Sequence, residues 1–307
     1  MKLACVLVNY NDEENSIRIA QILESYPIVS KVVLVDSCST NVMAFEKIQQ
    51  IASEKIDVIK ASKNGGYSFS LNYGIRHIEN LNQGFDTLML SNTDIEISEE
   101  AIKACVMKLH TSPLVGVVAP RMKLANGKYA RRNAWKTRTP IRDMAHSTRL
   151  TELLFWHWIR KWEYSDEDFK QPELLVDCVA GACFFSTLDV LKSIDYLDEE
   201  VFLFYEEDIL GYRLNYKQYQ TYLLNNVEFT HMESQSIKKT YNYYRKMEYL
   251  FKSRMYYQKN YNDINIFQIG LFYALWGFRH VELLIEVPIR RLKAIIQDKE
   301  YANWFKK

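Results

Sequence analysis

The feature that most constrains this fold is a regular alternation of short apolar runs and helix-like segments over the first 120 residues. The apolar runs lie at residues 3–9, 31–35, 56–60, 87–90 and 115–119. Strands that alternate with helices at this spacing predict βαβ units and a parallel sheet. Continuous apolar runs are typical of parallel strands that helices cover on both faces. The sequence therefore predicts an α/β domain.

Three of these runs end in a polar cluster. The first run ends at Asn9, the second at Asp36, and the fourth is followed by Asn92 and Asp94. Ligands of open α/β sheets bind outside the carboxyl ends of the strands, so we expect the clusters to lie along one edge. Asn92 and Asp94 are two residues apart and can face one point. The alternative is that these residues only form turns and helix caps.

Two common nucleotide-binding motifs are missing from the sequence. No GxGxxG follows the first strand, and no GxxxxGK[ST] occurs. This counts against a dinucleotide-binding Rossmann enzyme and a P-loop kinase. Asn64, Gly65 and Gly66 instead predict a flexible turn that leads into a helix over residues 68–78.

The composition counts against further classes of function. The 307 residues include 39 Lys and Arg against 38 Asp and Glu, a net charge of +1. A nucleic-acid-binding domain would carry a clear basic excess, so no nucleic-acid partner is expected. The five cysteines form no CxxC pair and are expected to be reduced thiols. Without a secretory signal pattern or an uninterrupted apolar run of about 20 residues, we expect a cytoplasmic protein that does not span a membrane.

The second half of the chain is less regular. Residues 121–172 are basic and aromatic, with Trp135 among them, and they predict a long irregular connection. This stretch is either a solvated loop or a phosphate-binding one. Order returns at residues 174–185, where Gly181 and Ala182 would let a ligand approach the backbone closely.

Two further candidates for chemistry follow. Glu206, Glu207 and Asp208 stand at the start of a predicted helix. Acidic residues suit a helix N-terminus, but three successive carboxylates exceed what a cap requires. A strand-like segment later in the chain ends at His231, which is either a structural residue or a ligand.

The order of these motifs resembles the family 2 glycosyltransferases, a large inverting group with a GT-A fold. The resemblance covers about residues 3–245, and the most similar members are rhamnosyltransferase-like enzymes that build bacterial surface polysaccharide. It rests on blocks at residues 8–11, 35–39, 64–68, 71–75, 90–94, 180–184, 202–208 and 231–236. Each block alone is weak, but their order and spacing together are strong.

The resemblance implies roles for the matching residues. Asp94 would match the second acid of the family's metal-binding DxD motif, with Asn92 in place of the first acid. His231 would be a further contact to Mn²⁺ or Mg²⁺. The residues expected to bind the donor are Asn9, Asp36, Gly65, Gly66, Asn72, Asn92 and Asp94. Those expected on the acceptor side are Gly181, Ala182 and Trp135.

The resemblance also implies a carboxylate base. Asp208, in the pair Glu207-Asp208, would match it, and Glu207 is the second candidate. Family members often read Glu-Asp-x-Asp here, and Leu210 stands where the last Asp would be. The choice among Glu206, Glu207 and Asp208 is therefore open by one residue. Such a base typically contributes ~10²–10⁴-fold in rate, and a divalent cation would stabilise the diphosphate that leaves.

The C-terminal part of the chain is a separate question. Residues 264–287 are apolar and aromatic, Arg290, Arg291 and Lys293 follow, and Trp304 lies near the end. Aromatic and basic residues together are typical of helices in a membrane interface. The alternative is that these helices pack on the catalytic domain or on a second subunit, as in a homodimer.

The sequence as a whole predicts a GT-A domain over residues 1–262 with a helical extension over 263–307. Residues 1–120 would form the half that binds the nucleotide-sugar, and residues 121–262 the acceptor-side half. The expected reaction is inverting transfer from a UDP- or dTDP-linked sugar to a saccharide acceptor. We expect that acceptor to be lipid-linked, at the cytoplasmic face of the membrane.

Two other functions compete with this interpretation. One is a catalytically inactive subunit that binds nucleotide-sugar or recruits partners at the membrane. The other is a sugar-phosphate nucleotidyltransferase, which needs a Gly-rich basic loop after the first strand. Residues 9–14 are acidic at that place, which counts against the second alternative.

Overall fold

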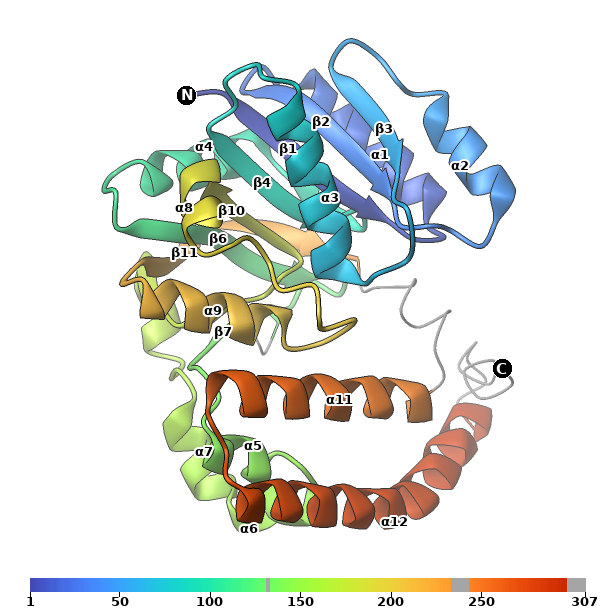
Figure 1. Ribbon diagram of the computed structural model, residues 1–307, viewed down its shortest axis with the longest axis vertical. Coiled ribbons are helices and arrows are strands. Elements are labelled where there is room, and N and C mark those ends of the chain that lie inside the picture. The colour runs from blue at the N-terminus through green and yellow to red at the C-terminus, as the bar shows by residue number, and fades with distance from the viewer. Residues whose placement is uncertain (131–132, 233–242, 297–307) are drawn as a thin grey trace.

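A mixed β-sheet flanked by helices forms one part of the molecule, and a layer of helices forms the other (Figure 1). The computed structural model describes residues 1–130, 133–232 and 243–296. Within these residues the sheet has nine strands, eight of them in the order β3-β2-β1-β4-β10-β6-β11-β5, with β8 paired to β11. The predicted α/β fold is therefore confirmed.

The first half of the chain follows the predicted alternation. Its elements are β1 (Leu3–Asn9), α1 (Glu13–Ser25), β2 (Val29–Asp36), α2 (Val42–Gln49), β3 (Ile56–Lys60), α3 (Tyr67–Asn80), β4 (Thr87–Asn92), β5 (Ile95–Ile97), α4 (Glu99–Leu109) and β6 (Val115–Leu124). Helices α1, α2 and α4 contribute to the apolar core on one face of the sheet. Helix α3 contributes to the core on the other face. Burial on both faces explains the continuous apolar runs of the strands.

The register of the parallel strands brings the polar clusters together. Strand β1 pairs in parallel with both β2 and β4, which places Asn9 opposite Asp36 and Val8 opposite Asn92. The carboxyl ends of these three strands thus meet at one edge, as the sequence predicts.

The second half of the sheet adds antiparallel strands to the parallel ones. Its elements are β8 (Glu173–Val176), β9 (Cys178–Val179), β10 (Cys183–Thr187), α8 (Leu188–Ser193), α9 (Glu206–Tyr216) and β11 (Gln220–His231). Strand β10 lies between β4 and β6 and is antiparallel to both, and β5 and β8 are antiparallel to β11. An apolar run has the same pattern in either direction, so the sequence did not distinguish the two.

The expectation of an irregular connection at residues 121–172 is wrong. This stretch holds β7 (Ala134–Trp135), α5 (Pro140–Ala145), α6 (Arg149–Leu154), α7 (Trp156–Trp162) and the 3-10 turn η1 (Asp168–Lys170). Thr139 caps α5, where Pro140 occupies the first turn, and Thr148 caps α6 through a capping box with Thr151. These residues are standard signals for the start of a helix. The helices that follow are too short for a helical repeat of apolar residues to be recognised in the sequence.

The predicted C-terminal helices are present. Helix α11 (Tyr243–Tyr261) lies beside the sheet domain, and α12 (Ile266–Ile296) runs along α5 and α6 (Figure 1). The motif residues 233–236 and Trp304 lie outside the described residues, and so do the side chains of Arg291 and Lys293. No helix in the described part of the chain has both the length and the hydropathy that crossing a bilayer requires. The five cysteines are free thiols, and all but Cys38 are buried.

Candidate active site

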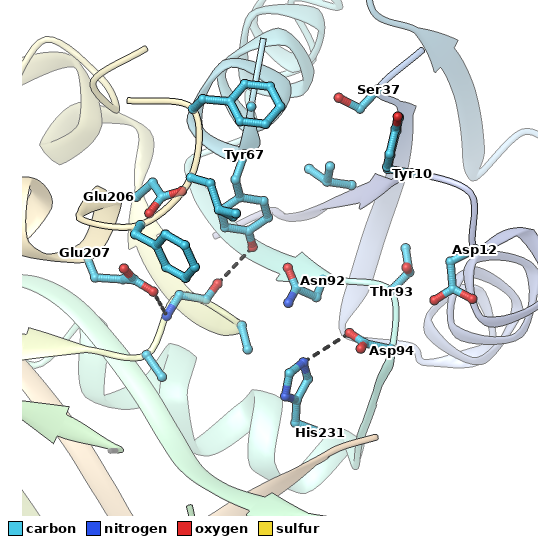
Figure 2. Close-up of a pocket in the computed structure, with 18 of the residues that line it drawn as sticks. Tyr10, Asp12, Ser37, Tyr67, Asn92, Thr93, Asp94, Glu206, Glu207 and His231 are labelled. Carbon is cyan, nitrogen blue, oxygen red and sulfur yellow. Dashed lines mark hydrogen bonds and ion pairs between the residues drawn. The ribbon is translucent and has the colours of Figure 1, made fainter. Parts of the chain in front are cut away.

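A cavity of about 340 Å³ lies at the carboxyl ends of β1 and β4 (Figure 2). Its walls combine strand ends, the turn before α3, the segment between β9 and β10, and the loop before α9. The predicted site residues in its lining are Gly66, Asn92, Asp94, Gly181, Ala182, Glu207 and His231. The predicted residues outside the lining are Asn9, Asp36, Gly65, Asn72, Trp135 and Asp208.

Strand pairing brings Asp94 and His231 together. Asp94 follows β4 directly, and β11 pairs antiparallel with the short strand β5 that comes next. The Met232 N–H donates to the Asp94 carbonyl oxygen at 2.9 Å. This pairing leaves His231 Nε2 3.2 Å from Asp94 Oδ1 (Figure 2). Two residues that are 137 positions apart in the chain thus form one acid–imidazole pair.

The Asp94–His231 pair fits a divalent cation. Asp94 Oδ2 is buried and has no hydrogen-bond partner in the described residues. A buried carboxylate oxygen without a partner is unfavourable unless a cation or a donor satisfies it. No group of three or more His, Cys, Asp or Glu residues in the described chain could enclose a metal. One carboxylate with diphosphate oxygens is a usual arrangement for Mg²⁺, so the donor would supply the remaining ligands.

Glu207 faces the cavity from the start of α9. Its Oε1 accepts a hydrogen bond from the Gly181 N–H at 3.1 Å, and Tyr67 donates its hydroxyl to the Gly181 carbonyl oxygen at 2.8 Å (Figure 2). A Cβ atom at position 181 would lie 2.9 Å from Glu207 Oε1. Residue 181 therefore needs to be glycine for the carboxylate to reach its backbone.

Glu206 and Glu207 both line the cavity and repel each other. Burial, and then the charge of Glu207, raise the pKa of Glu206 to about 8. Burial also raises the pKa of Glu207, but backbone N–H groups, including that of Gly181, oppose this shift. Two adjacent carboxylates in one site share a proton when their repulsion is strong. Glu206, with a pKa of about 8, thus keeps its proton near neutral pH.

Asp208 points away from the cavity. Its Oδ1 accepts from Trp135 Nε1 at 3.0 Å and lies 3.3 Å from Arg138 Nε. Burial raises the pKa of Asp208 to about 7, although the charge of Arg138 lowers it. The leading sequence candidate for the base is therefore outside the lining, and the second candidate, Glu207, is inside it. Trp135 contacts Asp208 and is likewise outside the lining.

A buried polar cluster fixes the backbone just before these acids. Asp143 Oδ1 accepts from Arg138 at 3.1 Å and from the Tyr205 hydroxyl at 2.8 Å, and Gln258 donates to Asp143 Oδ2 at 2.6 Å. Arg254 Nε donates to the Tyr205 hydroxyl oxygen at 2.9 Å. We call these five residues the helical clamp, since they join α5, α9 and α11. Tyr205 has a φ of 70°, a left-handed backbone that the clamp stabilises.

Asn9 and Asp36 are fully buried beneath the cavity. Asn9 Nδ2 donates to Asp36 Oδ1 at 2.9 Å, and Ser39 donates to the same carboxylate through its N–H and its hydroxyl. The Asn9 carbonyl oxygen accepts from the N–H of Ser37, a residue that lines the cavity. The structure thus places these two residues as supports, and direct contact with a nucleoside stays a prediction.

The other expected donor residues also act on neighbouring segments. Asn72 is buried and bonds both the N–H and the carbonyl of Leu197. Gly66 has a φ of 96°, and a Cβ there would collide with the Phe202 carbonyl. A Cβ at Gly65 would collide with the ring of Phe69. Gly66 and Asn72 let α3 and the segment before α9 approach each other closely, and Gly65 leaves room for Phe69 within α3.

Several lining residues were not predicted as site residues. They are Val8, Tyr10, Asp12, Ser37, Asn64, Tyr67, Thr93, Met122, Ala180, Phe202, Leu203 and Phe204. Tyr10, Ser37 and Tyr67 belong to the polar strand ends and the Gly-Gly turn, so their positions carried a usable signal. Met122 lies in the stretch expected to be irregular, and nothing in the sequence marked it.

The fold and this site define a class of protein, the glycosyltransferases with a GT-A fold. The chain belongs to the family described as Glycosyltransferase like family 2, which matches residues 3–246. Membership of this family supports the predicted enzyme class. Neither the rhamnosyltransferase-like subtype nor a bacterial source is shown by this match.

Individual relatives agree with the family. The chain is 28% identical to the low-salt glycan biosynthesis hexosyltransferase Agl10 of Haloferax volcanii over 212 residues, which are 69% of this chain and 61% of the relative. The chain thus matches less than two thirds of that protein's length. Two solved structures share the fold at low identity.

The first solved structure is GalNAc-T7 with UDP, GalNAc and Mn²⁺, with a TM-score of 0.54 and 12% identity over 76% of this chain and 44% of that one. The second is the mannosyltransferase PcManGT from Pyrobaculum calidifontis with GDP-Man and Mn²⁺. It has a TM-score of 0.52 and 13% identity, and the match covers 99% of this chain and 83% of that one. At these identities the similarity shows the fold alone.

Proposed function

We propose that this protein transfers a sugar, with inversion, from a nucleotide-sugar to a hydroxyl of a saccharide acceptor. One observation carries the proposal: a single cavity has Asp94, with an unpartnered buried oxygen, on one wall and the carboxyl group of Glu207 on another (Figure 2). A donor diphosphate needs positive charge at one end, and an acceptor hydroxyl needs a base at the other. A divalent cation held at Asp94 would meet the first requirement, and Glu207 would meet the second.

Each residue has a defined part in the reaction. The acceptor hydroxyl attacks the anomeric carbon, the bond to the diphosphate oxygen breaks, and Glu207 takes the hydroxyl proton. The Gly181 N–H holds one oxygen of Glu207 and leaves the other for the acceptor. Glu206 keeps its own proton, which limits the charge that repels Glu207. When bound at Asp94 and His231, a divalent cation stabilises the negative charge of the leaving diphosphate as a Lewis acid.

The names of the relatives support the proposed class of enzyme. The curated relative is a hexosyltransferase, and the two similar structures hold UDP or GDP-Man together with Mn²⁺. We propose a UDP- or dTDP-linked donor and a lipid-linked saccharide acceptor in the assembly of a surface polysaccharide. This is a rhamnosyltransferase-like role at the cytoplasmic face of a membrane.

We also propose a division of labour along the chain. Residues 1–120 bind the donor, residues 121–262 bind the acceptor and carry the base, and residues 263–307 form a helical extension. The short turn between α11 and α12 supports the last boundary, because it separates the two longest helices of the described chain.

The test combines donor binding with donor breakdown. Nucleotide-sugars are screened by thermal shift with and without Mn²⁺, and the best donor is then followed for slow hydrolysis without acceptor. We expect a metal-dependent rise in the melting temperature and hydrolysis that Glu207→Gln abolishes. Binding without any turnover on supplied acceptors would instead identify an inactive binding subunit. Release of diphosphate from a nucleoside triphosphate and a sugar phosphate would identify a nucleotidyltransferase.

A further inference from the structure

Helix α12 holds three of its charged residues against the protein and leaves a row of apolar residues exposed. Arg279, Glu282 and Glu286 are only 8%, 14% and 17% exposed in their side chains, and they pair with one another. Glu282 also accepts hydrogen bonds from the N–H groups of Arg149 and Leu150 at the start of α6. A surface helix normally has the opposite arrangement.

The outward side of this 31-residue helix carries a continuous apolar stripe. We name it the outward stripe: Phe267, Leu271, Phe278, Val281, Ile285 and Ile289, each between 42% and 85% exposed. Their spacings of three, four and seven residues place them on one side of the helix. Single exposed apolar residues are normal on protein surfaces, but a stripe that runs the length of a helix marks an interaction surface.

The stripe has apolar neighbours on the adjoining helices. Leu153, Leu154, Trp156 and Trp158 on α6 and α7 are 53–70% exposed. The two hydrogen bonds that Glu282 accepts hold the start of α6 against α12, so α6 adjoins the helix that carries the stripe. Tryptophan beside aliphatic residues is typical of the boundary between lipid and water.

Charge distinguishes a lipid surface from a second copy of this chain. Residues 149–162 and 266–296 contain seven basic and three acidic residues, a net charge of +4, while the entire chain carries +1. In a symmetric dimer this surface would face its own positive charge, which opposes association. An anionic bilayer instead attracts basic residues next to an apolar face.

We propose that the outward stripe and its neighbours on α6 and α7 dock this protein on an anionic lipid bilayer. Helix α12 then lies in the plane of the membrane interface, with its apolar side in the boundary between headgroups and acyl chains. Arg279, Glu282 and Glu286 remain on the protein side, where Glu282 holds α6. The docking does not depend on the proposed sugar transfer.

The test is co-sedimentation of the full chain with vesicles. One set of vesicles contains phosphatidylcholine with phosphatidylglycerol, and the other contains phosphatidylcholine alone. The test variant is Val281→Asp combined with Ile285→Asp, two residues of the outward stripe that are 54% and 63% exposed. The matched control is Met107→Asp on α4, at a position that is 71% exposed and outside the helical layer. Circular dichroism and melting temperature check that each variant is folded.

We expect wild type and Met107→Asp to sediment with the anionic vesicles and to be partly released by salt. The affinity of the double variant for anionic vesicles should be about tenfold lower than that of wild type, because aspartate opposes both the apolar and the electrostatic attraction. Equal binding of the double variant and wild type would overturn the proposal. A wild-type dimer that the double variant dissociates, without binding of wild type to either vesicle, would show that a second copy covers this surface.

Discussion

The two walls of the cavity are built in different ways. On the strand edge, Asp36 is held by Asn9 and Ser39, neutral residues at the ends of neighbouring strands. On the helical side, Asp143 is held by Arg138 and Gln258, charged and polar residues from separate helices and loops. The first wall thus follows from local strand-end chemistry, while the second depends on contacts between segments that are far apart in the chain.

This difference indicates on which wall a substitution should affect both activity and folding. At the strand edge, the Asp94 carboxylate has one oxygen without a partner, so that oxygen contributes no hydrogen bond to the fold. At the helical side, the proposed base Glu207 stands two residues after Tyr205, whose left-handed backbone the helical clamp holds. We therefore expect changes at the strand edge to affect activity first, and changes at the clamp to affect folding as well.

The largest expected effect is on the base itself. Glu207→Gln should lower kcat by roughly 10²–10⁴-fold while metal-dependent donor binding persists, because an amide cannot take the acceptor proton. The measurement is steady-state transfer together with a donor thermal shift. Asp208→Asn is the matched control and should be milder, since Asp208 lies outside the cavity lining. If the order of damage is reversed, Asp208 is the base and the helical wall has been misassigned.

Two buried acids, one on each side of the cavity, test whether the two walls differ in how they stabilise the fold. Both Asp143 and Asp36 are fully buried. Asp143→Ala should destabilise the protein by about 3–5 kcal/mol, because Arg138 loses a buried charged partner. Asp36→Ala should cost about 1–3 kcal/mol, since its partners Asn9 and Ser39 are neutral. Denaturant unfolding measures both values, and equal losses would remove the distinction between the two walls.

Replacing Asp94 tests whether a change at the strand edge affects activity without affecting stability. Asp94→Ala should reduce transfer by roughly 10²–10³-fold and abolish the metal-dependent part of donor binding. Its melting temperature should change little, because loss of the contact between Oδ1 and His231 is offset by removal of the buried Oδ2, which has no partner. Calorimetric titration with Mn²⁺ and donor checks this. Full activity of wild type in excess EDTA would contradict the assignment of Asp94 to a metal.

The smallest expected effect concerns pH and the paired acids. The folded pKa of Glu206 is raised to about 8 from an ordinary value of 4.5, so the folded state binds more protons between these values. Its contribution to stability is present below pH 4.5 and is lost as pH rises through 8. The free energy of unfolding should fall by at most about 1.4 kcal/mol per pH unit in that window. Glu206→Gln should flatten this slope in pH-dependent melting curves, and an unchanged slope would show that other groups cause it.

The same contrast explains what the sequence could predict. Strands β1 and β3 and the position of Asp94 follow from local apolar runs and the polar residues that end them. The choice among Glu206, Glu207 and Asp208 depends on the backbone at Tyr205, which residues as distant as Asp143 and Arg254 hold in place. No local pattern contains that information. The direction of β10 and the short helices of residues 140–162 were missed because their signals are short or symmetric.

The backbone of Gly181 connects the two walls of the cavity. Tyr67 on α3 bonds the carbonyl of Gly181, and Glu207 on α9 bonds its N–H, so Tyr67 and Glu207 influence each other without touching. A change at either position alters the fit of the other, and residue 181 has no freedom to compensate. Among related sequences, positions 67, 181 and 207 should therefore change together, with correlated substitutions rather than independent ones.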